Sequence, residues 1–312
     1  MDKTVGVLGG GQLGRMLQEA ANRLNVKLIT LDNGPDTPSK QINARSSHID
    51  GSFTDPKAIR HLAENCDILT IEIEHVDTDV LEDLSTGTET RDDWRLIKST
   101  KVDVQPHWRT IRVIQDKYDQ KEHLIKLGIP TTRSVPLRNN SITDMQHLGG
   151  DIGYPFMLKS RTGAYDGRGN YAVKIRSDIQ TALNALRDRP LYAEEWATFD
   201  LELAVMVVKV ENDAAADWRQ ATMAFPVAET IHEESICKLV YAPARNVSAS
   251  TQRQAQVLAR RAVAGFWGKG VFGVEMFLLS DGELEPFPVT VAHAYMLGEL
   301  LINEIAPRPH NS

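Results

Sequence analysis

The sequence predicts an α/β fold in the N-terminal half of the chain and an α+β fold in the C-terminal half. Short apolar stretches alternate with amphipathic helical stretches from the start of the chain, which is typical of a parallel sheet with crossover helices. A glycine-rich turn follows the first predicted strand, and several later strands carry single acidic residues. At 312 residues, of which 42% are hydrophobic, the chain is long enough for two or three domains.

The overall composition argues against several classes of protein. A formal net charge of −7 is unlike that of a nucleic-acid-binding protein, whose affinity comes mainly from Lys and Arg contacts to phosphate. No stretch is apolar for long enough to span a bilayer, and the first residues lack a signal-peptide pattern, so we expect a cytoplasmic protein without membrane contact. Cys66 and Cys237 are predicted to be buried free thiols, because neither has metal-ligand spacing.

The first elements form a βαβ unit. A strand over residues 4–8 leads into a glycine-rich turn over 9–14, a helix over about 15–24 and a second strand over 26–31 that ends at Asp32. This Gly-x-Gly-x-x-Gly arrangement is typical of Rossmann-like dinucleotide sites, in which the helix N-terminus receives a phosphate and an acidic residue binds the ribose. Many doubly wound domains use such a turn only for close helix packing, so an NAD-dependent oxidoreductase remains one alternative.

The alternation of elements continues beyond this unit. A strand predicted over residues 66–74 ends in Glu72 and Glu74, whose side chains are expected to point into a ligand crevice at the carboxyl edge of the sheet. Residues 86–101 are polar and lack either periodicity, which predicts a loop insertion. Residues 108–127 have helical periodicity and are predicted to form one helix.

A loop in the middle of the chain has the composition of a phosphate-binding site. An apolar strand over residues 154–158 delivers Lys159 to a loop that contains three glycines, and another short strand follows over 171–173. Glycines allow backbone N–H groups to converge on phosphate oxygens, while Lys159, Arg161 and Arg168 supply positive charge. The loop is not a Walker-A motif, because no helix with Gly-Lys-Ser/Thr follows it, and a glycine-rich surface turn is the plainer alternative.

Acidic residues interrupt the next two predicted strands. Glu194 and Glu195 lie on a strand over residues 191–196, which favours contacts with adenine and ribose over a position in the core. Glu202 lies on the following strand and needs either a partner or a solvated edge. His232 is either a ligand contact or a surface histidine.

Two later strands each embed one carboxylate among apolar residues. Glu275 and Glu304 would be costly to bury unless a cation neutralised them. With Asn303 beside Glu304, they would form a site of hard oxygen ligands, which suits Mg²⁺. A cationic loop together with such a site implies ATP-dependent phosphoryl transfer.

Taken together, these motifs resemble those of the ATP-grasp family, and among its members those of the N5-carboxyaminoimidazole ribonucleotide synthases. In fungi and plants such a synthase forms the N-terminal part of phosphoribosylaminoimidazole carboxylase. The resemblance rests on Lys159, the run Ala-Tyr-Asp-Gly-Arg-Gly-Asn at 164–170, the Glu-Met-Phe strand at 275–277 and the run at 303–312. Residues 9–14 and 110–121 fit the same family, so the similarity extends over nearly the whole chain. It implies a Rossmann-like pre-ATP-grasp domain followed by an ATP-grasp fold.

The resemblance also implies a reaction of purine biosynthesis that uses ATP and Mg²⁺. ATP phosphorylates bicarbonate to carboxyphosphate, and the amine of 5-aminoimidazole ribonucleotide then takes the carboxyl group. A lid that excludes water would protect carboxyphosphate, which hydrolyses readily.

By position, the resemblance assigns roles to individual residues. The residues implied to bind ATP are Lys117, Lys159, Ala164, Gly167, Gly169, Asn170, Glu194, Glu195, Trp196, Ala197, Glu202, His232, Asn303 and Glu304. Those implied to contact the substrate ribonucleotide are Gly10, Gly11, Gln12, Leu13 and Glu74. Mg²⁺ would be bound by Glu275 and Glu304. The reaction centre would be formed by Tyr165, Asp166, Arg168, Arg308, His310 and Asn311.

The resemblance predicts three domains. These are a Rossmann-like substrate-binding domain over residues 1–104, a linker helix with a small lid subdomain over 105–190, and a large ATP-grasp subdomain over 191–312. Family members continue beyond the point that matches residue 312, so we expect a C-terminally truncated ATP-grasp fold, and a catalytically impaired ATP-binding fragment is a further alternative. Members of the family often form homodimers, and a carboxymutase domain can be fused to them or act as a partner.

The final strand has two possible registers. Residues 284–299 form an insertion relative to the family, which usually joins its last two motif strands by a short hairpin. If residue 283 onward pairs directly after the Asp-Gly turn, prolines interrupt the strand pairing. We therefore predict that the insertion loops out and that residues 300–305 pair with 273–279, because this register buries Leu301 and keeps Glu304 beside Glu275.

Overall fold

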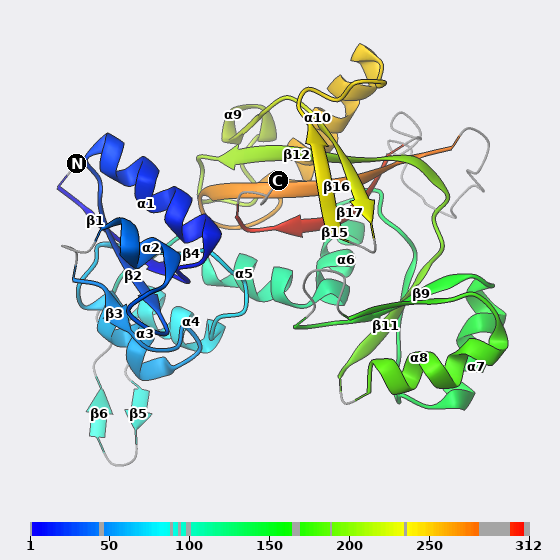
Figure 1. Ribbon diagram of the computed structural model, residues 1–312, viewed down its shortest axis with the longest axis horizontal. Coiled ribbons are helices and arrows are strands. Elements are labelled where there is room, and N and C mark those ends of the chain that lie inside the picture. The colour runs from blue at the N-terminus through cyan, green and yellow to red at the C-terminus, as the bar shows by residue number, and fades with distance from the viewer. Residues whose placement is uncertain are drawn as a thin grey trace.

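The structure is a computed structural model that describes most of the chain. The described residues are 2–43, 47–87, 90–92, 95–97, 101–163, 169–187, 189–233, 236–280 and 300–308, and for 90–92 and 95–97 only the backbone is considered. They form three main sheets, which we call the N-terminal, small and large sheets. Figure 1 shows the N-terminal sheet with its helices at one end of the molecule, the small sheet at the other end and the large sheet between them.

The N-terminal sheet is parallel, as predicted for an α/β domain. Its strand order is β3-β2-β1-β4-β7. The strands are β1 (Thr4–Leu8), β2 (Lys27–Asp32), β3 (Ile49–Asp50), β4 (Ile68–Ile71) and β7 (Asp103–Val104). The helices of this part are α1 (Gln12–Leu24), α2 (Pro38–Ile42), α3 (Pro56–Ala63) and α4 (Thr78–Thr86). Because β4 ends at Ile71, the acidic residues that follow it lie at the carboxyl edge of the sheet, where ligands bind in such folds.

The predicted loop insertion over residues 86–101 contains regular structure. Strands β5 (Thr90–Asp92) and β6 (Arg95–Ile97) form an antiparallel hairpin. The prediction of an irregular loop is therefore wrong for these residues. A strand of three residues is too short for an alternating pattern to be recognised in the sequence.

The prediction of a single helix over residues 108–127 is also wrong, because the chain forms two helices there. Helix α5 (Trp108–Gln115) ends before Asp116, whose backbone is extended, and helix α6 (Lys117–Lys126) begins directly after it. The Asp116 side chain accepts hydrogen bonds from the backbone N–H groups of Tyr118 and Asp119. The capping aspartate stabilises the start of a new helix. The apolar periodicity of the sequence continues across the break and therefore does not reveal it.

The small sheet is antiparallel, in the order β10-β9-β11-β8. Its strands are β8 (Ser134–Pro136), β9 (Phe156–Ser160), β10 (Asn170–Val173) and β11 (Leu191–Glu195), and it packs with α7 (Ile142–Ile152) and α8 (Ile179–Ala185), a short 3-10 helix (Arg176–Asp178) preceding α8. Strand β11 pairs with both β8 and β9. The chain therefore leaves the small sheet only after Glu195, beyond the predicted domain boundary between residues 190 and 191.

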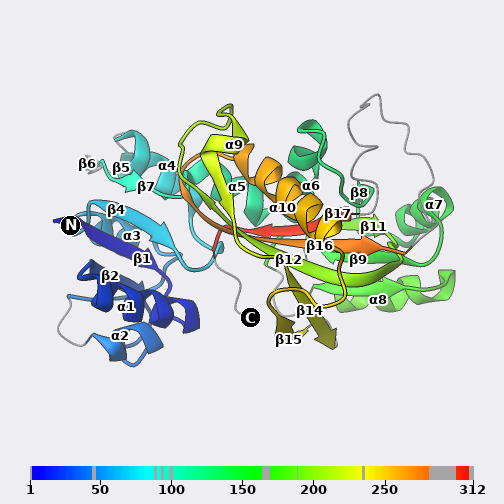
Figure 2. The same ribbon diagram turned by 90° about the horizontal axis from the view of Figure 1, so that it is seen from above.

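The large sheet has the order β15-β14-β12-β16-β17, and β13 pairs with β12. Its strands are β12 (Phe199–Lys209), β13 (Thr222–Ala224), β14 (Ala228–Glu233), β15 (Ile236–Tyr241), β16 (Gly270–Leu279) and β17 (Leu300–Ala306). Helix α9 (Trp218–Ala221) is short, whereas α10 (Ala249–Ala264) contributes six buried residues. Leu124 of α6 belongs to the same hydrophobic core as α10, so α6 is anchored on the large sheet. Figure 2 shows α6 and α10 lying near β16 and β17.

Two further sequence predictions concern the cysteines and the membrane. Cys66 and Cys237 are free thiols, as predicted, but both are only partly buried, which corrects the expectation that they are buried. Cys237 lies on the edge strand β15, and burial raises the pKa of Cys66 to about 11. None of the helices within the described ranges is both long and apolar enough to cross a membrane.

Candidate functional site

The centre of the site is a pair of facing carboxylates on β16 and β17. Glu275 and Glu304 are direct partners across these antiparallel strands, which confirms the predicted register. The register then shifts, since Met276 pairs with Ile302, and Asn303 is left as the extra residue of a β-bulge. In a regular strand Ile302 and Glu304 would share a face. The bulge separates them, so that Ile302 is fully buried while Glu304 remains half-buried beside Glu275.

The prediction was wrong about which leucine of β17 is buried. Leu300 is the buried leucine of β17, whereas Leu301 is only partly buried. The loop over residues 281–299, which includes the Asp-Gly turn and the predicted insertion, lies outside the described residues.

Lys117 lies against this acidic pair. As the first residue of α6, it places its Nζ 2.5 Å from Glu304 Oε2. Burial lowers the pKa of Lys117, but the carboxylates of Glu304, Glu275 and Glu74 outweigh this effect and raise it. The ammonium group therefore stays charged and neutralises part of the acidic cluster.

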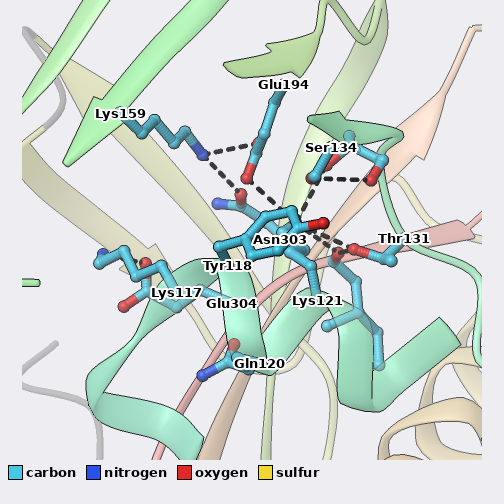
Figure 3. A network of polar contacts seen from close by, with 12 residues as sticks. Lys117, Tyr118, Gln120, Lys121, Thr131, Ser134, Lys159, Glu194, Asn303 and Glu304 are labelled. Atoms are coloured by element: carbon cyan, nitrogen blue, oxygen red, sulfur yellow. Dashed lines mark hydrogen bonds and ion pairs between the residues drawn. The ribbon is translucent and has the colours of Figure 1, made fainter. Parts of the chain in front are cut away.

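A second network of polar contacts lies next to the first and joins the small sheet to the large sheet (Figure 3). Lys159 Nζ, at the end of β9, donates to Glu194 Oε2 at 2.8 Å and approaches Asn303 Oδ1 at 3.5 Å. The other oxygen of Glu194 accepts from the Tyr192 hydroxyl at 2.9 Å and lies 3.5 Å from Lys121 Nζ. Burial raises the pKa of Glu194, but the two lysines outweigh it and hold that pKa at about 2. Glu194 is thus an ionised carboxylate shared between two ammonium groups.

The loop that was predicted to bind phosphate lies between β9 and β10, next to this network. Strands β9 and β10 form the predicted hairpin, with Asn170 directly opposite Lys159. Gly169 closes the loop with a φ of 104°, which favours glycine, and its carbonyl accepts a hydrogen bond from the Ser160 N–H. The loop residues Ala164, Tyr165, Asp166, Gly167 and Arg168, together with His310 and Asn311, lie outside the described residues.

Arg161 does not serve as a free positive charge for this loop, contrary to the prediction. Its guanidinium group donates to Asp116 Oδ2 at 2.9 Å and to Asp119 Oδ1 at 2.9 Å. Its carbonyl oxygen accepts from the Lys117 N–H at 2.8 Å. Arg161 therefore ties the base of the loop to the first turn of α6.

The end of β11 and the neighbouring strands carry the other predicted nucleotide contacts. Glu195 and Trp196 are exposed and Ala197 is partly exposed, so all three are accessible beyond the buried Glu194. Glu202 of β12 has the partner that its position required, because its Oε2 lies 3.0 Å from His232 Nδ1. The hydrogen-bonding carboxylate of Glu202 raises the pKa of His232, although burial opposes the shift.

A contact between distant parts of the chain brings together Glu74 and Arg308. Arg308 Nε donates to Glu74 Oε2 at 3.1 Å, over a separation of 234 residues. Burial raises the pKa of Glu74, but the guanidinium charge outweighs it and lowers that pKa. Gln115 fixes the same segment by donating to the carbonyls of Glu74 and Val76. A predicted substrate contact and a predicted reaction-centre residue are therefore neighbours.

The N-terminal glycine turn is already occupied by carboxylates of the protein itself. The Gly10 N–H donates to Asp32 Oδ2 and the Gly11 N–H to Glu72 Oε2, each at 2.7 Å. A Cβ atom on Gly11 would lie 2.9 Å from Glu72 Oε1, so glycine is needed for this approach. A dinucleotide pyrophosphate would have to displace both carboxylates, which disfavours the NAD alternative. Of the other predicted turn residues, Gln12 begins α1 and Leu13 is buried in its first turn.

Three residues of the networks were missed by the sequence analysis. These are Gln120 and Lys121, both almost fully buried on α6, and Tyr192 on β11. Lys117, Gln120, Lys121 and Leu124 follow the i, i+3, i+4, i+7 spacing of one helix face. Polar residues at positions where the period predicts burial were the signal that could have identified them.

Within the described part of the chain, no group of three or more His, Cys, Asp or Glu side chains could hold a metal ion by itself. Glu275 and Glu304 nevertheless supply facing hard oxygen donors. Mg²⁺ is commonly bound by one or two carboxylates together with substrate phosphates, so this pair fits such an ion.

Comparisons with known proteins agree with this geometry. The chain is 51% identical to phosphoribosylaminoimidazole carboxylase of Saccharomyces cerevisiae over 310 residues, which cover 99% of this chain and 48% of the yeast protein. It is 32% identical to N5-carboxyaminoimidazole ribonucleotide synthase of Synechococcus elongatus, covering 99% of this chain and 67% of that protein. The chain thus spans about half the length of the fungal relatives it matches.

Solved structures show the same similarity. Carboxyaminoimidazole ribonucleotide synthase of Aspergillus clavatus complexed with ATP superposes with a TM-score of 0.85 at 49% identity, covering 99% of this chain and 71% of that one. The Aspergillus clavatus enzyme in complex with ADP and 5-aminoimidazole ribonucleotide gives a TM-score of 0.83 at 48% identity, with the same coverage.

Family models match both halves of the chain. A ribonucleotide synthetase preATP-grasp domain matches residues 1–115, and an ATP-grasp domain matches residues 122–312. The fold predicted from the sequence, a Rossmann-like pre-ATP-grasp domain followed by an ATP-grasp fold, is therefore confirmed. With its paired carboxylates and strand-end lysine set between two sheets, the chain belongs to the ATP-grasp family.

Proposed function

We propose that this chain catalyses the ATP- and bicarbonate-dependent carboxylation of 5-aminoimidazole ribonucleotide to N5-carboxyaminoimidazole ribonucleotide, a step of purine biosynthesis. One observation carries the proposal: Lys117, Lys159 and the facing Glu275 and Glu304 converge where the small and large sheets meet. Basic groups for phosphates and acidic groups for a divalent cation are the requirements of phosphoryl transfer from ATP. The ligands of the Aspergillus clavatus relatives support this reaction class.

In this proposal the nucleotide lies between the two sheets. Lys117 and Lys159 bind its phosphates, and the glycine loop that begins beyond Arg161 covers them. Residues 195–197 border the adenine, and the buried carboxylate of Glu194 faces Lys121 and Lys159. Glu202, oriented by His232, accepts hydrogen bonds from the ribose hydroxyls, because an ionised carboxylate offers only acceptors.

Glu275 and Glu304 would hold Mg²⁺, with Asn303 beside them. When bound, the ion supplies positive charge that neutralises the phosphate oxygens during transfer. Lys117 forms an ion pair with Glu304 in this structure, and in the proposal it is also one of the two lysines that bind the phosphates. We propose that Lys117 exchanges Glu304 for a phosphate oxygen when the nucleotide is present.

The proposed reaction has two steps. In the first, a bicarbonate oxygen attacks the terminal phosphorus of ATP, the bond to the bridging oxygen breaks, and ADP leaves. In the second, the amine of the ribonucleotide attacks the carboxyl carbon, phosphate leaves, and the amine loses a proton. Arg308 would stabilise the negative charge on the carboxyl oxygens, with Tyr165, Asp166, Arg168, His310 and Asn311 completing the reaction centre.

The substrate ribonucleotide would bind between the N-terminal sheet and the acidic pair. Glu74 lies at this position and is fixed by Arg308 and Gln115. Gly10, Gly11, Gln12 and Leu13 would border the same space. Because the Gly10 and Gly11 amides are already paired with carboxylates, we propose that their part is to hold the turn open rather than to bind a phosphate.

The proposal extends to the organisation of the protein. We propose domains over residues 1–104, 105–195 and 196–312, the second boundary following from the pairing of β11. We also propose that the protein acts in the cytoplasm, that it forms a homodimer, and that a carboxymutase domain is fused to it or acts as its partner.

The test is ADP formation by the purified chain. We expect sustained ADP formation to require both bicarbonate and 5-aminoimidazole ribonucleotide with Mg-ATP, because the second step consumes the carboxyphosphate made in the first. Lys159→Met should lower the rate by about a hundredfold, as loss of a charge-stabilising donor does elsewhere. The matched control is Lys126→Met, which removes an exposed lysine from the last turn of α6. ATP binding without any ADP formation would favour the impaired-fragment alternative, and tight NAD binding without ATP binding would favour the oxidoreductase.

A further inference from the structure

Lys121 is a buried cation that has no role in the proposed reaction. Its side chain is 2% exposed, and its Nζ donates to Thr131 Oγ1 at 2.9 Å and to Thr132 Oγ1 at 3.0 Å. The Ile302 carbonyl lies at 3.3 Å and Glu194 Oε1 at 3.5 Å. Burial lowers the pKa of Lys121 to about 8, against the opposing effect of Glu194, so the group remains mostly protonated at neutral pH.

These contacts join the two sheets through a single side chain. Lys121 comes from α6, Ile302 from β17 of the large sheet, and Glu194 from β11 of the small sheet. Thr131 precedes the small sheet and forms an isolated bridge with Ile302. The position of the Glu194 carboxylate relative to β17 therefore depends on Lys121 (Figure 3).

The charges of this cluster explain why a lysine is useful there. Glu194 lies between Lys121 and Lys159, so the three groups together carry one net positive charge. Without Lys121, Glu194 and Lys159 would form a neutral pair, and the positive charge of Lys159 would be compensated inside the protein. A buried ion pair is not needed for stability, because apolar side chains of similar size often replace one without loss.

We propose that Lys121 is a positioning residue for nucleotide phosphates: it fixes and neutralises Glu194, so that Lys159 presents uncompensated positive charge to the ligand. This inference rests on the proposed ATP site. It assigns Lys121 an effect on the phosphate part of the nucleotide and none on the adenine part.

The experiment compares a ligand with phosphates and one without them. Dissociation constants for Mg-ATP and for adenosine are measured by calorimetry on the full chain and on Lys121→Met, with Lys126→Met as the surface control. We expect Lys121→Met to weaken Mg-ATP binding by about tenfold or more, which corresponds to the loss of one charge-assisted contact. Adenosine binding should change by less than about twofold, a change worth well under 1 kcal/mol.

A merely structural role gives a different result. If Lys121→Met weakens both ligands equally, or leaves Mg-ATP binding unchanged in a folded protein, the proposal is overturned. If the natural chain binds no ATP at all, the proposed function fails and this inference fails with it. Normal ATP binding by the natural chain together with an unaffected Lys121→Met removes the inference alone.

A second variant covers the case in which Lys121→Met does not fold. Lys121→Met combined with Glu194→Gln removes both of the almost fully buried charges, and it is compared with Glu194→Gln alone. With Glu194 neutral, Lys159 keeps its charge without help, so we expect the two variants to bind Mg-ATP within about threefold of each other. A further tenfold loss on removal of Lys121 would show that it acts independently of Glu194 and would overturn the proposal.

Discussion

Glu304 experiences opposing electrostatic effects from its neighbours. The carboxylate of Glu275, its partner across the strands, repels the Glu304 carboxylate, whereas the Lys117 ammonium, with its Nζ at 2.5 Å, attracts it. A divalent cation between the two carboxylates would remove the repulsion. The acidic pair is therefore arranged to gain from a cation that the nucleotide brings with it.

Neutralising Glu304 should weaken binding of the metal-nucleotide complex. We expect Glu304→Gln to raise the dissociation constant of Mg-ATP by about tenfold or more, because one charged oxygen ligand is lost. Glu211→Gln, at an exposed position after β12, is the control and should change it by less than about twofold. Calorimetric titration measures both, and equal effects would mean that Glu304 does not contact the metal-nucleotide complex.

Acid should reveal the pairing of Glu194. Its pKa is about 2 in the folded protein, where two lysines outweigh the effect of burial, against 4.5 for a free glutamate. The folded state therefore binds this proton less readily than the unfolded state, and the stabilisation is complete above pH 4.5 and lost as the pH falls toward 2. The free energy of unfolding of the natural chain should fall more steeply in this range than that of Glu194→Gln. Urea unfolding at a series of pH values measures the two slopes, and parallel slopes would contradict the pairing.

At the scale of elements, α6 organises the site from one face. Lys117 contacts the Glu304 carboxylate, Gln120 the backbone of Ile305, and Lys121 the carbonyl of Ile302. Gln120 Nε2 donates to the Ile305 carbonyl and its Oε1 accepts from the Ile305 N–H, both at 2.8 Å. This side chain makes the two hydrogen bonds that a neighbouring strand would otherwise make with β17.

Removing that amide should destabilise the protein. Gln120→Leu leaves the N–H and C=O of Ile305 buried without their partner, which we expect to lower the free energy of unfolding by about 2–4 kcal/mol. Gln180→Leu, an exposed glutamine on α8, is the matched control and should stay within about 0.5 kcal/mol. Urea unfolding measures both values, and faster hydrogen exchange at Ile305 should accompany the loss. Unchanged exchange would show that β17 does not depend on Gln120.

Regular elements with a strong pattern were predictable from the sequence, whereas their interruptions were not. The strands around Glu275 and Glu304 were recognised because a carboxylate in an apolar strand requires a counter-charge. The break at Asp116 was missed because helical periodicity continues across it. The β-bulge at Asn303 was missed for a similar reason, since a change of one residue in register becomes visible only when the partner strand is known.

Across the whole molecule, the site depends on contacts between distant segments. The Glu74–Arg308 pair joins the end of the N-terminal sheet to the residues that follow β17. The predicted resemblance placed both residues near the substrate, but their direct pairing could not be read from the sequence. The same holds for Lys121 and Glu194, because each looks like an ordinary charged residue until the sheets are assembled.

The contribution of the Glu74–Arg308 pair can be measured with a double-mutant cycle. Glu74→Gln, Arg308→Gln and the double variant should give a coupling energy of about 1–3 kcal/mol, because the pair is largely shielded from water. The control is the same cycle on Arg133 and Asp151, an exposed pair with side chains 42% and 59% accessible, for which we expect less than about 1 kcal/mol. Free energies of unfolding supply all the terms. A coupling no larger than that of the exposed pair would mean that Glu74 and Arg308 do not hold the domains together.

Asn303 can be removed by shortening the chain instead of by exchanging its side chain. Without this residue, Ile302 and Glu304 would become neighbours on a regularly alternating strand, still opposite Met276 and Glu275. The apolar side of β17 would keep its order, and only the amide next to Lys159 would be lost. A one-residue deletion is therefore the cleanest way to remove a single polar group from the proposed nucleotide site.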